Sequence, residues 1–303
     1  MSARLLLILF AAQIVFAQAA RDLGGVWTNT TITPLERPAE FAGKQFFTPE
    51  EAAKFEHETN QHNDADNRES NPEADVNHAY NQFWWDRGTK VGAGLRTSLI
   101  IDPPDGRVPP LTPVAQKRMQ EQFARSREHS TDGPEDRALT ERCILWPTAG
   151  PPMLPSFYNN EYQIVQSRDS VAIVVEMIHD VRIIPLDGRP HLASNIRQWL
   201  GDSRGHWEGD TLVVDTTNFT EKSRFRGADE NLHLTERFTR VNPNMILYEF
   251  TVDDPTAFTK PWTAQVPMMK TKGPVFEYAC HEGNYAMVDM LAGARAAEAK
   301  KSK

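Results

Sequence analysis

The sequence of 303 residues is poor in cysteine and has no excess of positive charge. It contains two Cys, and 41 Asp and Glu outnumber 33 Lys and Arg, for a formal net charge of -8. An acidic chain without a basic run is repelled by nucleic-acid phosphates and by anionic membrane surfaces. We therefore expect a small-molecule ligand, with neither a nucleic-acid nor a membrane partner. The sequence leaves the oligomeric state open.

Long apolar runs are confined to the N-terminus. Residues 1–19 combine the positive charge of Arg4, an apolar stretch from Leu5 to Phe16, and the small residues Ala17 and Ala19. This arrangement is typical of a cleaved secretory signal peptide. A membrane anchor is the alternative, but the apolar stretch is shorter than the roughly 20 residues that span a bilayer. The sequence therefore predicts a periplasmic or secreted protein.

Strong catalytic and metal-binding motifs are also missing. The sequence has no G-x-S-x-G, no H-E-x-x-H, no glycine-rich phosphate loop and no Cys/His spacing of a zinc site. A hydrolase with a nucleophilic serine is therefore unsupported, whereas a site dispersed along the chain remains open. We expect no cofactor and assign no metal ligand, and the sequence leaves open whether a metal ion binds.

The two cysteines, Cys143 and Cys280, form an even pair in a chain with a predicted export signal. Exported proteins fold in oxidising compartments, where such a pair favours a disulfide. Two buried free thiols are the alternative. The sequence thus predicts a Cys143–Cys280 disulfide that closes a very long loop.

Short strand-like runs fill the sequence from residue 171 to residue 252. They are rich in Val, Ile, Thr and aromatic residues, and turns rich in Gly, Pro, Asn and Asp separate them. The turns are too short for the crossovers that parallel strands need. We therefore predict an antiparallel meander that forms a lipocalin-like barrel, with a β-sandwich as the alternative.

Helix signals lie outside this meander. Thr48-Pro49 and Thr112-Pro113 each place a capping residue before a proline, which is typical of a helix start. A helical tail is expected over 285–303. A packed, proline-rich link joins a helix-containing half, 20–146, to a strand-rich half, 156–284. We therefore predict a single mainly β domain over 20–284 with two or three peripheral helices.

His179 is the polar residue in an otherwise apolar row of the strand-like run from Val171 to Ile184. Strict alternation places it on the face that also carries Met177 and Val181, so it is expected to point into the interior. A buried imidazole needs hydrogen-bond partners and titrates near neutral pH. A structural core histidine is the alternative to a catalytic one.

Further polar and aromatic side chains complete a candidate site. One imidazole would accept a proton, an arginine would hold an oxyanion, and a carboxylate would orient the imidazole. Paired Trp residues beside Asp86 and Arg87 would form a stacking wall for a sugar or aromatic ligand. The predicted catalytic residues are His179, His233, Arg197 and Glu282, and the predicted ligand-binding residues are Trp84, Trp85, Trp199 and His281.

These features favour an exported enzyme that acts on a small or sugar-like molecule by general acid–base chemistry inside a β-barrel cavity. A lyase, an isomerase and a hydrolase all fit. The alternative is a periplasmic or secreted protein that binds a small ligand without catalysis.

Two resemblances accompany this reading. Gly25-Val26-Trp27 resembles the first-strand motif of lipocalins, in which the Trp fills the closed end of the barrel. Gly188–Phe219 and Asn231–Asp254 resemble a family of uncharacterised exported bacterial proteins. That resemblance implies export but no activity, so no site residue is carried over from it.

Overall fold

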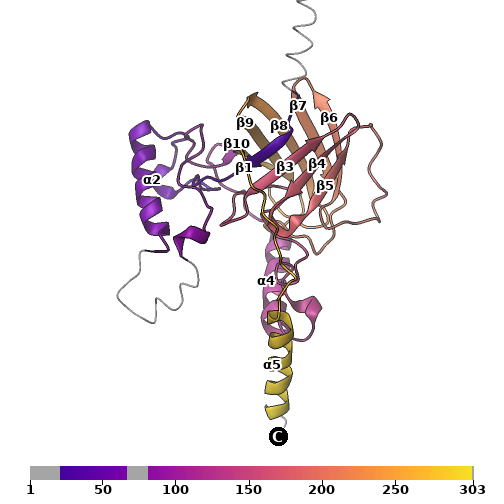
Figure 1. Cartoon of the computed structure of the whole chain (residues 1–303). Coiled ribbons are helices and arrows are strands. Elements are labelled where there is room, and N and C mark those ends of the chain that lie inside the picture. The colour runs from indigo at the N-terminus through magenta and orange to yellow at the C-terminus, as the bar shows by residue number, and fades with distance from the viewer. Residues whose placement is uncertain (1–20, 67–80, 302–303) are drawn as a thin grey trace, which may run out of the picture.

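A computed structural model describes residues 21–66 and 81–301, and its centre is a ten-stranded antiparallel sheet within these residues (Figure 1). The predicted signal peptide lies outside the described residues. The strands are β1 (Gly25–Thr28), β2 (Ile100–Asp102), β3 (Glu161–Gln166), β4 (Ser170–Val175), β5 (Val181–Pro185), β6 (Asp202–Glu208), β7 (Thr211–Thr217), β8 (His233–Asn242), β9 (Met245–Asp253) and β10 (Trp262–Thr271).

The strand order is β5-β4-β3-β1-β10-β9-β8-β7-β6, and β2 pairs with β10 beside this path. Strands β6 to β10 follow one another as a meander, as do β3 to β5, and the short strand β1 joins the two meanders. The prediction of a mainly β, antiparallel fold is confirmed. Within the described residues, no ladder pairs the two end strands, β5 and β6.

Three α-helices flank the sheet in the described part of the chain. Helix α2 (Pro49–Asn63) begins at Thr48 with a complete capping box, and α4 (Pro113–Glu128) begins at Thr112, whose side chain accepts a hydrogen bond from Ala115 N. Helix α5 (Ala286–Lys301) is the expected tail. Figure 1 shows α2 beside the sheet and α4 and α5 projecting from one end of it.

The inner face of the sheet is filled by large side chains. Alternation along β8, β9 and β10 turns every second residue inward, and the aromatic ones are fully buried. Trp27 is also fully buried, and its Nε1 donates to Leu23 O at 2.9 Å. The largest fully buried side chains include Trp27, Trp262, Tyr162, Tyr248, Phe238 and Phe250.

A charged group crosses this interior. Arg182 on β5 forms a two-pronged ion pair with Glu236 on β8, and Arg182 Nη2 lies 3.0 Å from Glu236 Oε1. The hydroxyl of Tyr248 donates to the same Oε1 at 2.8 Å and accepts a hydrogen bond from Met153 N at 3.0 Å. Arg182, Glu236 and the Tyr248 hydroxyl therefore all have hydrogen-bond partners, as burial of charge requires.

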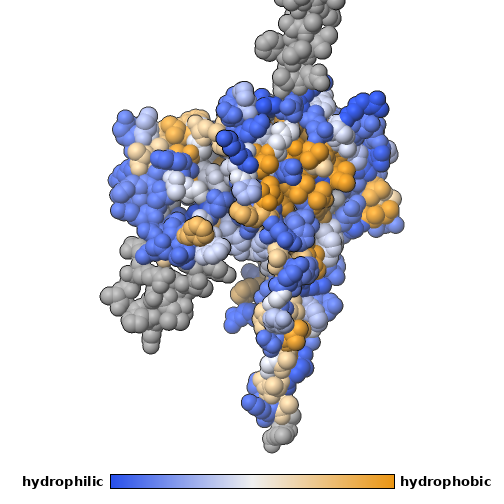
Figure 2. All heavy atoms as spheres, in the orientation of Figure 1, coloured by the Kyte–Doolittle hydropathy of each residue, from blue (hydrophilic) through white to orange (hydrophobic). Residues whose placement is uncertain are grey.

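The turn between β4 and β5 reverses the expected side-chain alternation. Ile178 and His179 have φ angles of 64° and 48°, so the chain bends sharply after Val175. Beyond the bend, Val181 and Ile183 are 51% and 64% exposed, and Arg182 is buried. The expectation that Val181 and His179 share an inward row is therefore wrong. Figure 2 shows hydrophobic residues gathered over the outer face of β3, β4 and β5.

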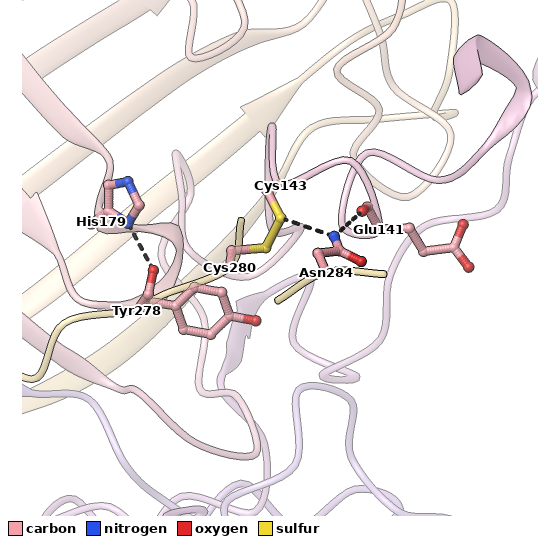
Figure 3. The surroundings of a disulfide bond; sticks show 6 residues. All are labelled: Glu141, Cys143, His179, Tyr278, Cys280 and Asn284. Atoms are coloured by element: carbon pink, nitrogen blue, oxygen red, sulfur yellow. Dashed lines mark hydrogen bonds between the residues drawn. A yellow bond between two sulfur atoms is a disulfide. The ribbon is translucent and has the colours of Figure 1, made fainter. Parts of the chain in front are cut away.

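The predicted disulfide joins Cys143 to Cys280, with 5.8 Å between the Cα atoms (Figure 3). Asn284, four residues beyond Cys280, donates from its side chain to Glu141 O at 3.2 Å. The bond therefore anchors the chain after β10 to the segment that precedes β3. This prediction is confirmed.

Candidate functional site

His179 does not point into the interior. It is exposed in the turn η4 (Met177–His179), and its Nδ1 lies 3.0 Å from Tyr278 O on the segment held by the disulfide (Figure 3). The sharp bend described above carries the imidazole outward. The prediction of a buried catalytic His179 is therefore wrong in its placement.

The other predicted catalytic residues are not gathered around His179. His233 Nε2 is bonded to Asp215, and Arg197 Nη1 donates to Glu230 O at 2.8 Å. Glu282 is exposed just beyond the disulfide, as is the predicted ligand residue His281. In the described parts of the chain, no hydrogen bond or ion pair joins His179 to His233, Arg197 or Glu282.

The Trp residues predicted to bind a ligand do not lie together in one site. Trp84 is exposed in η2 (Gln82–Trp84), and Trp85 is half-buried beside it. Trp199 lies elsewhere and lines a pocket of about 20 Å³ together with Ser223 and Arg224. That volume holds about one water molecule, so this pocket is too small for a ligand.

Two histidines do share a carboxylate. Asp215 on β7 accepts His191 Nε2 at 2.7 Å and bonds His233 Nε2 through its other oxygen, while His191 Nδ1 lies 2.9 Å from Asp202 Oδ2. The hydrogen bond and charge of Asp215 raise the pKa of His233 above its usual value. Because both nitrogens of His191 face carboxylates, this ring acts as a tie between strands.

A second charged cluster lies where β3 begins. The β3–β4 register pairs Tyr162 with Val175, so Glu161 and Glu176 face each other just beyond the ladder. Glu176 N donates to Glu161 O at 3.0 Å, and Glu161 N donates to Glu176 Oε2 at 3.3 Å. Two negative charges that face each other in a sheet repel, so the charged form of these carboxyl groups is disfavoured.

Burial and neighbouring charge change the ionisation of Glu161. Partial burial and the negative charges of Glu176 and Asp86 raise the pKa of Glu161 from 4.5 to about 7. Its Oε2 is buried and has no hydrogen-bond partner among the described residues. Glu176 differs, because it is buried and its Oε1 accepts Phe276 N at 2.7 Å. Glu161 is therefore a proton donor or acceptor poised near neutral pH.

Aromatic side chains flank Asp86, whose negative charge acts on Glu161. The ring of Trp85 lies 5.7 Å from Phe157 and 6.3 Å from Tyr158, and the guanidinium of Arg87 lies 4.3 Å from the Trp85 ring. The side chain of Asn160, the residue before Glu161, donates to Asp86 O. The Trp85-Asp86-Arg87 segment is therefore attached directly to the start of β3.

The start of β3 therefore combines a proton donor with aromatic rings. Aromatic faces stack on the apolar faces of sugar rings, and convergent polar groups fix their orientation. Sequence reasoning found Trp85 and its polar neighbours but missed Glu161 and Glu176. The missing information was the β3–β4 register, which brings residues 15 positions apart to face each other.

Across 21–66 and 81–301, no group of three His, Cys, Asp or Glu side chains is arranged to hold a metal ion. Of the helices described, none has the length and apolar content needed to cross a bilayer.

Comparison with known proteins gives no match to a family model, to a curated protein or to a solved structure. A function for this chain must therefore be argued from the chemistry of its own residues, and the cluster around Glu161 is the arrangement that offers such chemistry.

Proposed function

We propose that the protein is an enzyme that acts on a small, sugar-like molecule with Glu161 as the general acid–base. The observation that carries this proposal is the pKa of Glu161, about 7, at the start of β3, to which the Trp85-Asp86-Arg87 segment is attached. Groups with strongly shifted pKa values concentrate at functional sites, because a catalytic proton donor works best near the ambient pH.

Each neighbour has a role in this proposal. Partial burial, together with the negative charges of Glu176 and Asp86, keeps Glu161 protonated up to neutral pH. Trp85 supplies a stacking face, with Arg87 above it as a polar handle. Proton transfer at a substrate oxygen or carbon suits a lyase, an isomerase or a hydrolase, and the three differ in the bond that breaks.

The first experiment identifies a ligand and then tests Glu161. Purified protein is screened against sugars, sugar acids and aromatic glycosides by thermal shift, since a ligand of the folded state raises the melting midpoint. Conversion of each hit is followed by NMR. We expect Glu161→Gln to lower turnover by about 100-fold or more while the hit still binds.

The matched control is Glu277→Gln, which alters an exposed carboxylate three residues before Cys280. It should leave turnover unchanged. Turnover of Glu161→Gln equal to that of the wild type would contradict the proposal, and so would loss of turnover in both variants alike.

Binding without catalysis is the second candidate function. One observation favours it: a cleft of about 260 Å³ on the outer face of β9 and β10. In that case the screen yields ligands that raise the midpoint but are recovered unchanged.

We also propose that the sheet curls into a lipocalin-like barrel. The Arg182–Glu236 pair supports this, because it links β5 to β8 across the interior. A Cβ added to Gly205 on β6 would lie within 2.8 Å of Ile184 and Leu186 side-chain atoms, so the two end strands approach each other closely. Export to the periplasm or the medium is proposed as well, and the disulfide is compatible with it.

A further inference from the structure

The outer-face cleft lies between the sheet and the segment that leads into β2. One wall is formed by outward-facing residues of β9 and β10, among them Leu247 and Pro267. The other wall is formed by residues 92–99, which include Arg96 and the buried Leu99. A Cβ added to Gly92 would lie 3.2 Å from Pro267, so the two walls touch there. The lining is mostly apolar.

Arg96 is the charged residue of this lining, and it lacks a counter-ion. Its guanidinium lies 4.9 Å from the ring of Phe46, and its Nε is buried without a hydrogen-bond partner. Among the residues that the structure describes, Arg96 forms no ion pair or hydrogen bond. Glu249, on the strand wall, instead accepts a hydrogen bond from Gln265 at 3.3 Å.

A second arginine adds to the positive charge. Arg37 is 2% exposed, and it donates to Thr97 Oγ1 at 2.9 Å and to Pro104 O at 2.8 Å, which are both neutral acceptors. The partial burial of Arg96 and, after it, the nearby charge of Arg37 lower the pKa of Arg96. Two neighbouring guanidinium groups without a carboxylate partner are unfavourable, and an anion would offset this cost.

We propose that this cleft binds an aliphatic monocarboxylate of medium chain length, with the carboxylate paired to Arg96. The aliphatic walls would take the hydrocarbon chain, and the guanidinium would form two parallel hydrogen bonds with the carboxylate. The volume of the cleft, about 260 Å³, is far below the roughly 1,000 Å³ of the largest drug-sized pockets. A volume of this size suits a ligand with a single short chain. This inference does not depend on the role of Glu161.

Isothermal titration of the wild-type protein with hexanoate, octanoate and decanoate tests the apolar part. Each added CH2 group should tighten binding by about fourfold until the cleft is full. Octan-1-ol has the same chain without the charge, and it should bind at least about tenfold more weakly than octanoate. Equal binding of the acid and the alcohol would overturn the proposal without any variant.

Three variants locate the site. Arg96→Gln should reduce octanoate affinity to that of octan-1-ol, and Leu247→Trp should abolish binding of both by filling the cleft. Arg168→Gln removes a charge at the exposed β3–β4 turn, where the side chain is 91% exposed, and should change nothing. Circular dichroism confirms folding. Octanoate binding that survives Leu247→Trp, or no binding to the wild type, would refute the cleft as the site.

Discussion

At the scale of single residues, the ionisation of Glu161 couples folding to pH. Its pKa is raised from 4.5 to about 7, so the folded chain holds this proton more tightly than the unfolded chain. The stabilising contribution is complete below the unfolded pKa and is lost as the pH rises through the folded value. The protein therefore carries a destabilising carboxylate above neutral pH.

Glu161→Gln should remove this penalty. We expect the variant to be more stable than the wild type at pH 8, by on the order of 2 kcal/mol, because 1 pKa unit corresponds to about 1.4 kcal/mol and partial exposure reduces the full effect. At pH 4.5 the two proteins should differ little. Urea unfolding at both pH values measures the difference, and Glu277→Gln should give the same difference at each.

Some residues of the site could be predicted from sequence and others could not. The disulfide was predictable because Cys143 and Cys280 are the only two cysteines. Trp85 was found as part of an aromatic cluster. Glu161 was missed because its pKa depends on its burial and on Glu176, and only the strand register shows that the two residues face each other. The predicted inward position of His179 was wrong because side-chain alternation assumes a continuous strand and cannot reveal a bend.

At the scale of elements, β5 and β8 depend on one buried ion pair. Arg182 and Glu236 are 7% and 0% exposed, so neither charge can be solvated by water if its partner is lost. Removing one member leaves an uncompensated charge in the interior. Replacing both by apolar residues removes the charge problem altogether.

This difference gives a prediction for urea unfolding. Glu236→Gln should lower the free energy of unfolding by about 3–5 kcal/mol, because it leaves the buried Arg182 charge without a counter-ion. The double variant Arg182→Met, Glu236→Met should be less destabilised than the single variant. Tyr248→Phe, which removes the hydrogen bond to Glu236 and the one from Met153 N, should cost about 2 kcal/mol. If the double variant has a lower free energy of unfolding than Glu236→Gln, the ion pair itself contributes net stability.

The strands were predictable from the sequence, but the order in which they pair in the sheet was not. Runs of β-branched and aromatic residues between turn residues indicated the meander from β6 to β9. Nothing in the four residues of β1 indicated that it lies between β3 and β10, because that position is decided by pairing between distant segments. The approach of β5 to β6 is likewise decided by distant segments, so the closed barrel stays a proposal.

At the scale of the whole molecule, the disulfide closes a loop between residues separated by 137 positions. Cross-linking so long a loop restricts the unfolded chain, which the chain-entropy account values at about 5 kcal/mol. Cys143→Ser, Cys280→Ser should lower the free energy of unfolding by about that amount. Unfolding in urea with and without a reductant checks the result on the unaltered protein, and unchanged stability would contradict it.

The place of β1 in the sheet has a consequence for the timing of folding. Its two neighbours, β3 and β10, both lie downstream, and Val26 pairs with Gln163 on one side and Thr271 on the other. A sheet dominated by such distant pairings folds slowly, because the chain must pay a large loop entropy before it gains contacts. One edge of the first strand therefore stays unpaired until β10, the last strand in the described part of the chain, has been synthesised.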